Sequence, residues 1–306
     1  MNKILITPRS LTREAHPALS QLIDAGFELV FSSPGRLPEE VELMHLLTGC
    51  IGYLAGVEKI TGRVLNATKD LRVISRNGTG VDNIDLEAAG KKQIQICRTA
   101  GANAQGVAEL TLALLLALVR SIPFSDAGLK KTRWQRSKGI ELKGRVLGLV
   151  GCGEIGKRTA RMAVGMGMQV VAYDFLPDPS LRLNNFAYVD LADLYRRADF
   201  ISLHCPAAAN GEPIIGAGEI RKMKKGVFLI NTARASLLDH DAVLAGLESG
   251  NIAGLALDVF DVEPPDDYRL VQDERVIATP HIGGYTYESV TRATVQAVEN
   301  LIQALK

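Results

Sequence analysis

The hexapeptide GCGEIG, from Gly151 to Gly156, constrains the fold of this chain more than any other stretch. It follows the apolar run RVLGLV and opens a segment of helical pattern that extends from Ile155 to about Gly165. Its glycines permit a tight turn, a close approach of backbone to a diphosphate, and close packing of helix against strand. Alone, a G-x-G-x-x-G stretch is weak evidence, because many are ordinary turns.

Asp174 strengthens this interpretation. It ends the next apolar run, QVVAYD, and lies 18 residues beyond Gly156, since 174 − 156 = 18. An acid at this place accepts hydrogen bonds from the ribose hydroxyls of a dinucleotide, whereas the alternative is a solvated carboxylate at a strand end. Because an acid repels a 2′-phosphate and no arginine follows within FLPDP, the sequence predicts NAD rather than NADP as the cofactor.

Runs rich in β-formers alternate with helical segments on both sides of this motif. They are KILIT, FELVFS, CIGYLA, LRVISR and IQICRT before it, and RVLGLV, QVVAYD, FISLHC, VFLINTA, IAGLALDVF and VIATP from Gly144 onward. Long helices are expected from Asn103 to Val119 and over SVTRATVQAVENLIQAL. The pattern predicts an α/β protein of two Rossmann-like or flavodoxin-like doubly wound parallel-sheet domains with a cleft between them, the second with about six strands.

Composition argues against several kinds of partner. Lys+Arg 35 against Asp+Glu 34 gives a formal net charge of +1, so neither nucleic acid nor a membrane surface is indicated. The most apolar segment, Leu110 to Val119, is shorter than the roughly 20 residues of a membrane span. The four cysteines form no C-x-x-C pair, which predicts reduced thiols, no metal site and a cytoplasmic protein. A small-molecule ligand is the expected partner.

Polar residues end three of the later strands, where an open α/β sheet binds its ligands. VFLINTAR ends in Arg234, LALDVFDVEP carries Asp258 and Glu263, and RVIATPHIGG carries His281. Each has a plain alternative: a surface arginine, a carboxylate of an acidic loop, a satisfied core histidine. Together they fit one chemistry, because hydride transfer to a 2-oxo acid needs a cation for the carboxylate, an acid for the carbonyl oxygen, and a neighbour that keeps this acid protonated.

The motifs RNGTGVDNID, GCGEIG, INTARASLLD, LDVFDVEPP and TPHIGG, in this order, resemble those of the D-isomer-specific 2-hydroxyacid dehydrogenase family. The resemblance implies that Arg234 orients the substrate, that His281 is the general acid and base, and that Glu263 raises the pKa of His281. It implies a substrate-binding domain of residues 1 to about 97 plus 286–306, and an NAD-binding domain of residues 98–285.

The same resemblance implies the binding residues. The cofactor set is Gly151, Gly153, Glu154, Ile155, Gly156, Asp174, Cys205, Pro206, Thr232, Ala233, Arg234, Asp258, His281, Gly283 and Gly284. The substrate set is Arg76, Asn77, Gly78, Thr79, Arg234 and His281, with the backbone N–H groups of the loop from Asn77 to Gly80 directed at the substrate carboxylate. The loop could also be a simple turn.

Within the family, the fingerprint is closest to D-3-phosphoglycerate dehydrogenases without a C-terminal regulatory domain. Arg76 and Arg136 match basic positions near the substrate phosphate of those enzymes, although either could be a solvated surface residue. Tyr53 and Leu54 stand where those enzymes usually carry an arginine. The substrate could therefore instead be hydroxypyruvate, glyoxylate, sulfolactate or a larger sugar acid.

Two further expectations concern partners. A homodimer through the NAD-binding domain is expected, with the helix Leu110–Val119 and the segment around Trp134 as candidates for its interface; burial of that helix within one chain is the alternative. A rival function is an NAD(H)-sensing corepressor-like binding protein, since some members that resemble this family act in transcription.

Overall fold

The structure is a computed structural model that describes residues 2–208 and 210–306, in two compact units. The first unit comprises Met1–Asn103 and Thr286–Lys306, and the second comprises Ala104–Tyr285. The second unit is thus an insertion in the chain of the first.

The first unit is built on a five-stranded parallel sheet of order β2-β1-β3-β4-β5. Side chains alternate between its faces: Ile4 and Ile6 enter one core and Leu5 enters the other. Burial on both faces is typical of parallel strands covered by helices, and it explains why these runs read as continuous apolar stretches. The strands are β1 (Lys3–Ile6), β2 (Glu28–Phe31), β3 (Cys50–Ala55), β4 (Val73–Arg76) and β5 (Gln95–Arg98).

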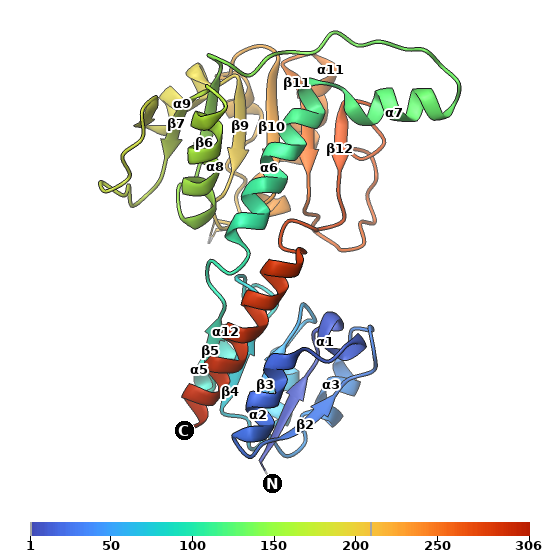
Figure 1. The fold of residues 1–306 in the computed structure, drawn as a ribbon, viewed down its shortest axis with the longest axis vertical. Coiled ribbons are helices and arrows are strands. Elements are labelled where there is room, and N and C mark those ends of the chain that lie inside the picture. The colour runs from blue at the N-terminus through green and yellow to red at the C-terminus, as the bar shows by residue number, and fades with distance from the viewer. Residues whose placement is uncertain (1, 209) are drawn as a thin grey trace. The chain divides into compact units, whose positions relative to one another are not determined.

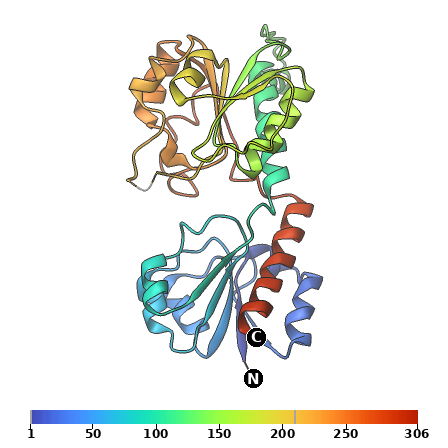
Figure 2. The same ribbon diagram turned by 90° about the vertical axis from the view of Figure 1, so that its left-hand side faces the viewer.

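The C-terminal helix α12 (Tyr287–Leu305) covers one face of this sheet, as both ribbon views show (Figures 1 and 2). Thr286 caps it, accepting a hydrogen bond from Ser289 N at 3.1 Å. Ala297, Val298 and Leu301 are fully buried on its inner side. The other helices of this unit are α1 (Arg9–Arg13), the 3₁₀ turn η1 (Pro17–Leu19), α2 (Ser20–Asp24), α3 (Glu40–Leu46), α4 (Gly62–Ala67) and α5 (Leu86–Lys91).

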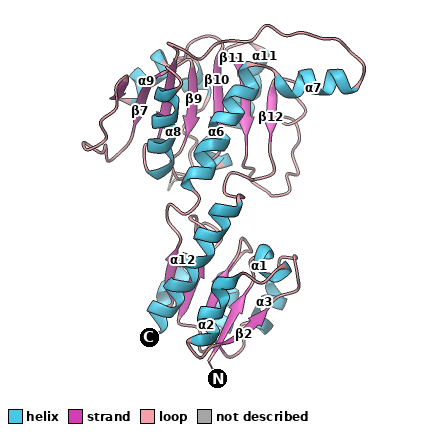
Figure 3. Cartoon of the chain, viewed as in Figure 1, coloured by secondary structure: helices cyan, strands magenta, loops and turns pink. Residues whose placement is uncertain are grey.

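The second unit contains a seven-stranded parallel sheet of order β12-β11-β10-β9-β6-β7-β8 (Figure 3). The sequence predicted six of these strands. The seventh, β8, is a three-residue strand at the edge of the sheet and was not predicted. The strands are β6 (Val146–Val150), β7 (Gln169–Tyr173), β8 (Phe186–Tyr188), β9 (Phe200–Leu203), β10 (Val227–Asn231), β11 (Ile252–Leu257) and β12 (Val276–Ala278).

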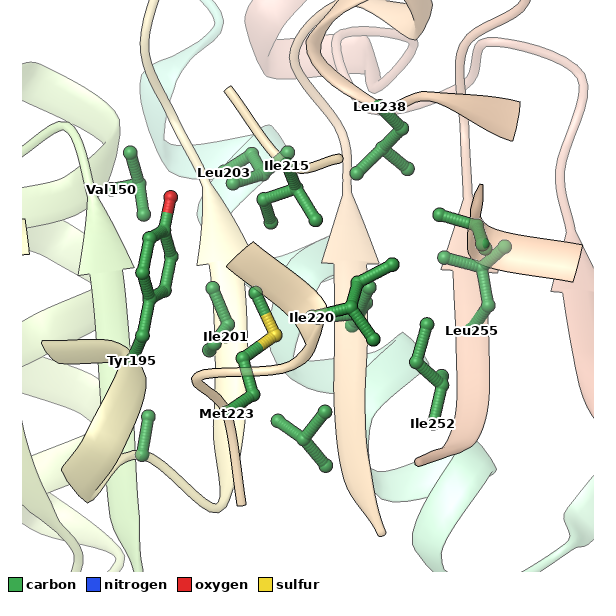
Figure 4. Packing of buried hydrophobic residues seen from close by; sticks show 14 of the residues in the cluster. Val150, Tyr195, Ile201, Leu203, Ile215, Ile220, Met223, Leu238, Ile252 and Leu255 are labelled. Carbon is green, nitrogen blue, oxygen red and sulfur yellow. The ribbon is translucent and has the colours of Figure 1, made fainter. Parts of the chain in front are cut away.

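Helices cover both faces of this sheet and enclose two separate cores. α6 (Ala104–Val119) and α8 (Glu154–Gly165) pack together on one face, while α9 (Leu191–Arg197) and α11 (His240–Glu248) lie on the other. Figure 4 shows the core beneath α9 and α11. There Tyr195 packs among aliphatic side chains, and its hydroxyl donates a hydrogen bond to Ile214 O at 2.9 Å. The remaining helices of this unit are α7 (Ile122–Lys130), α10 (Ala217–Ile220) and the 3₁₀ turn η2 (Ala235–Leu237).

No single helix in residues 2–208 or 210–306 is long and apolar enough to cross a membrane. In the described part of the chain, α6 and α7 taken as a pair reach the necessary length and composition, but that pair is bent by 63°.

Candidate active site

The glycine-rich turn of the predicted motif joins β6 to α8. Gly151 has φ = +94°, a left-handed conformation that favours glycine, and a Cβ there would lie 2.7 Å from the backbone carbonyl of His204. The loops after β6 and β9 are therefore in direct contact. This is the point where the strand order reverses, and ligands of doubly wound sheets bind at such points.

The head of α8 has the features of a diphosphate site. A Cβ on Gly156 would lie 2.4 Å from Gly151 O, so glycine is required for the helix to approach the turn. A Cβ on Gly153 would meet no atom within 4 Å, and Gly153 provides no capping side chain for the first N–H groups of the helix. Open space in front of uncapped helix N–H groups suits the diphosphate of a dinucleotide. The adjacent Glu154 side chain pairs with Arg158 at 3.2 Å, and Ile155 is half-buried.

Asp174 follows β7 and holds the turn in place. Its Oδ2 accepts from Cys152 N at 2.6 Å and its Oδ1 from Leu176 N at 2.9 Å. The carboxylate is thus oriented by backbone donors of two loops, while the residue remains partly exposed. Nearby, Lys157 of α8 forms a 2.5 Å ion pair with Asp178, which lowers the pKa of Asp178 through a direct hydrogen bond.

The predicted cofactor residues after β9 and β10 lie at the same carboxyl edge of the sheet. Burial raises the pKa of Cys205 to about 11, so its thiol is protonated at neutral pH, and Pro206 next to it is exposed. Thr232 is nearly buried, and its hydroxyl lies 3.2 Å from that of Thr111 on α6. Ala233 N donates to Asn231 Oδ1 at 3.1 Å.

His204 also lies at this edge, a residue that the sequence interpretation passed over. Its Nε2 is 3.0 Å from Ser202 Oγ, and burial lowers its pKa to about 4, so the ring is neutral at physiological pH. The signal was available in the sequence, because His204 directly precedes Cys205 at the end of the run FISLHC.

Asp258 organises the loop that follows β12. It is 1% exposed, and its Oδ1 accepts from Thr279 Oγ1 at 2.6 Å and from Ile282 N at 2.8 Å. Its Oδ2 accepts from Gly283 N at 2.8 Å. Three donors therefore stabilise this buried carboxylate, and they fix the loop on both sides of His281. Thr279, whose hydroxyl donates to Asp258, is a further site residue that was not predicted from the sequence.

His281 and Glu263 form a direct pair. The His281 Nδ1 atom lies 2.8 Å from Glu263 Oε1 and 2.9 Å from Oε2. This hydrogen bond raises the pKa of His281, against the opposing effect of burial. Burial alone would raise the pKa of Glu263, but the hydrogen bond and charge of His281 outweigh it, and the pKa is lowered. His281 also has φ = +53°, an uncommon backbone conformation for a residue with a side chain, and such conformations cluster at functional sites.

Arg234 belongs to the same group of charges. Its positive charge lowers the pKa of both Glu263 and His281. Arg234 follows β10, which lies beside β11 in the sheet, and β11 lies beside β12, so the three residues follow neighbouring strands. Its Nη1 donates to Ala233 O at 2.7 Å. The three residues predicted to act together, Arg234, Glu263 and His281, are therefore gathered at one edge of the sheet, next to the half-buried Gly284.

The predicted substrate loop lies in the first unit, after β4. Asn77 N donates to Ala55 O at 2.9 Å and Gly78 N donates to Arg76 O at 2.8 Å, so these amides serve the fold. The backbone N–H groups of Thr79 and Gly80 have no acceptor among the described residues, so they remain available to donate hydrogen bonds to a ligand. Arg136, in the second unit, is exposed in the segment after α7.

In chemical terms the second unit combines a dinucleotide cradle with a histidine held in a protonatable state. Within residues 2–208 and 210–306, no group of three His, Cys, Asp or Glu side chains could hold a metal ion. A glycine turn at the reversal point of a parallel sheet, an acid at the next strand end and a His–Glu pair define a dinucleotide-dependent oxidoreductase.

The chain belongs to the D-isomer specific 2-hydroxyacid dehydrogenase family, because the model of that family's NAD binding domain matches residues 112–283. It is an NAD-dependent oxidoreductase. The predicted family, cofactor and fold class are therefore confirmed.

Individual relatives agree with this assignment. The chain is 39% identical over 274 residues to a hydroxypyruvate reductase of Thermotoga maritima, covering 87% of this chain and 89% of that protein. It is 40% identical over 252 residues to a D-3-phosphoglycerate dehydrogenase of Methanocaldococcus jannaschii, covering 81% of this chain but 48% of that protein. The TT0316 protein of Thermus thermophilus has a similar crystal structure, with a TM-score of 0.89, 34% identity, and coverage of 99% of this chain and 96% of that one.

Proposed function

We propose that this enzyme interconverts a small D-2-hydroxy acid and its 2-oxo acid, with Arg234, Glu263 and His281 as the groups that act on the substrate. The nicotinamide of bound NAD would exchange the hydride with the substrate carbon. The observation that carries the proposal is the hydrogen bond of 2.8 Å between His281 Nδ1 and Glu263 Oε1.

The His281–Glu263 pair accounts for proton transfer to and from the substrate. In neutral His281, the Nδ1–H group donates to Glu263, so Nε2 carries the lone pair that removes a proton from the substrate hydroxyl. In the reverse direction, protonated His281 gives its Nε2 proton to the carbonyl oxygen, and Glu263 stabilises the imidazolium. Arg234, whose planar guanidinium suits a carboxylate, is assigned to bind the acid group of the substrate.

In the first unit, the loop from Arg76 to Thr79 is assigned to substrate binding. The amides of Thr79 and Gly80, which have no acceptor in the described parts of the chain, support this assignment. In the second unit, the edge defined by Gly153, Asp174 and Cys205 is assigned to the dinucleotide, and the open space at Gly153 supports it.

Two classes of substrate, phosphorylated and unphosphorylated acids, are each supported by separate observations. Arg76 and Arg136, together with relatives named D-3-phosphoglycerate dehydrogenase, support a phosphorylated acid. The chain spans only about half the length of those relatives, for example 54% of the pig enzyme, but 89% of the Thermotoga hydroxypyruvate reductase. The match over nearly the whole length of the Thermotoga hydroxypyruvate reductase supports an unphosphorylated acid such as hydroxypyruvate.

The test is a panel of 2-oxo acids assayed by loss of NADH absorbance. We expect reduction of at least one small 2-oxo acid, with NADH strongly preferred to NADPH. Failure to reduce any plain, phosphorylated or sulfonated 2-oxo acid, in protein that binds NADH, would contradict the proposed function.

We further propose that the protein is a cytoplasmic homodimer assembled through its second unit. Figure 1 shows α7 and the segment after it extending from this unit, and Phe124, Leu129 and Trp134 are exposed on them, Trp134 by 82%. The helix α6, the other candidate, has ten residues buried within its own unit and supports the interface less. Replacing Trp134 and Leu129 by serine should shift the mass in light scattering towards that of the monomer, and an unchanged mass would contradict this interface.

A further inference from the structure

A buried carboxylate lies at the reversal point of the first unit's sheet. In the order β2-β1-β3-β4-β5, the chain leaves in opposite directions from β1 and β3, and ligands of such sheets bind beyond the carboxyl ends of these two strands. Glu58 follows β3 at this point and is 3% exposed. It has no part in the chemistry assigned to Arg234, Glu263 and His281.

Three donors fix one oxygen of Glu58. Its Oε1 accepts hydrogen bonds from Thr7 Oγ1 at the end of β1, from Tyr53 OH on β3, and from Gly56 N, the last at 2.8 Å. Burial, and then the Glu58 charge, raise the pKa of Tyr53 well above its usual value, so its hydroxyl stays protonated and remains a donor. Three donors on one oxygen stabilise a negative charge there.

The other oxygen of Glu58 lies apart from these three donors. Oε2 is buried and has no hydrogen-bond partner among the described residues. A Cβ on Gly56 would lie 2.6 Å from it, so the glycine leaves room for the carboxylate in this position. Little solvent is present to screen such a charge, and it acts on nearby ligand groups more strongly than a surface carboxylate does.

Glu58 also offsets the positive charge of Arg76, the residue expected to attract a substrate phosphate. Arg76 of β4 is the register partner of Ala55 at the end of β3, and Glu58 follows three residues after Ala55, so both charges lie at the same end of neighbouring strands. The Arg76 guanidinium is folded back on its own loop: Nη1 donates to Asn77 O at 2.6 Å, and a Cβ on Gly78 would lie 2.4 Å from this atom. This end of the sheet is therefore not the strongly cationic surface that a phosphate requires.

We propose that Glu58 is a specificity-determining residue that makes the enzyme select 2-oxo acids with an uncharged far end and discriminate against phosphorylated ones. The inference rests on the proposed function and names its substrate class. Hydroxypyruvate and pyruvate are of the favoured class, and 3-phosphohydroxypyruvate is of the disfavoured class.

The test compares kcat/KM for hydroxypyruvate and 3-phosphohydroxypyruvate at saturating NADH, in the wild type and in Glu58→Gln. We expect the wild type to prefer hydroxypyruvate by at least about tenfold. In Glu58→Gln, which keeps the shape of the side chain without its charge, the preference should narrow by about tenfold, chiefly through a lower KM for the phosphorylated acid. The matched control is Glu87→Gln, at an exposed glutamate of the same unit, which should leave the ratio unchanged.

The outcomes separate the two proposals. A wild-type preference for the phosphorylated acid, or an unchanged ratio in a folded Glu58→Gln variant, overturns the role of Glu58 and leaves the dehydrogenase assignment standing. Absence of activity on both acids and on the wider panel overturns the proposed function itself. Thermal unfolding midpoints show whether the variant is folded, and if it is not, the wild-type ratio alone decides.

Discussion

The Nδ1 atom of His281 is 2.8 Å from Oε1 of Glu263 and 2.9 Å from its Oε2, so one ring nitrogen faces both carboxylate oxygens. This contact joins the loop after β12 to the loop after β11, 18 residues apart in the chain. It orients the ring, and it raises the pKa of His281, which favours the protonated form that the reduction needs.

Replacing His281 by alanine should lower kcat by roughly 10²-fold or more, because general acid–base catalysis contributes about 10² to 10⁴. NADH binding, measured by fluorescence titration, should remain near normal. The control is His45→Ala, at an exposed histidine of the first unit. Turnover close to the wild-type value in His281→Ala would remove this residue from the mechanism.

Replacing Glu263 by glutamine should change the pH profile. The hydrogen bond to Glu263 raises the pKa of His281, and the reduction needs protonated His281, so activity is lost as the pH rises through that pKa. Without the carboxylate charge the loss should begin at a pH lower by about one unit or more. The measurement is kcat/KM for reduction against pH, with exposed Glu274→Gln as the control. An unshifted profile would show that Glu263 acts only structurally.

Replacing Asp258 by asparagine should loosen the loop that carries His281. The Nδ2 group of asparagine cannot accept from Gly283 N or Ile282 N, and a buried donor left without an acceptor costs about 1 to 3 kcal/mol. We expect a lower thermal unfolding midpoint together with a lower kcat. Asp261→Asn, at a side chain 60% exposed, is the control and should change neither. Equal behaviour of the two variants would argue against a role for Asp258.

Replacing Gly156 by alanine should disturb the cofactor turn. The added methyl group would lie 2.4 Å from Gly151 O, and overpacking of this kind costs about 1 to 3 kcal/mol. The unfolding midpoint and the NADH affinity should both fall. Gly165→Ala is a close control, because it lies on the same helix and its Cβ would meet nothing within 4 Å. That variant should be neutral or slightly more stable.

Replacing Asp174 by asparagine should weaken NADH binding by about tenfold, the loss expected for one charge-assisted hydrogen bond. The preference for NADH over NADPH should narrow as well, because the charge that repels a 2′-phosphate is gone. Titration with both cofactors measures this, and Asp241→Asn, at a side chain 79% exposed, is the control. An unaltered NADH to NADPH ratio would indicate that Asp174 only braces the turn.

Most of the fold could be predicted from local sequence patterns. GCGEIG lies between a strand and a helix as predicted, and all five apolar runs before Asn103 are strands of the first sheet. Each of these signals is contained in one continuous segment, where spacing and apolar pattern are decisive. β8, a three-residue strand at the edge of the sheet, was not predicted, whereas the equally short β12 was, because it lies within the longer run VIATP.

Most of the predicted site residues end apolar runs. Of the missed residues, His204 also ends such a run, whereas Glu58 and Thr279 depend on contacts between distant segments. Glu58 gives no signal in its loop, since its meaning comes from Thr7, which is 51 residues away in the chain. Thr279 likewise becomes significant only once Asp258, 21 residues earlier, accepts its hydroxyl. A carboxylate that is solvated in one fold is buried and bonded in another, and spacing alone cannot distinguish the two.

The helix α12 has a consequence for how the protein is made. Ala297, Val298 and Leu301 complete a core whose strands were synthesised within the first hundred residues. During translation we expect that core to stay incomplete until α12 has been synthesised. The second unit, Ala104–Tyr285, is continuous in sequence and can close earlier. We therefore expect the nascent chain to fold its second unit first, although the ribosome begins with the other.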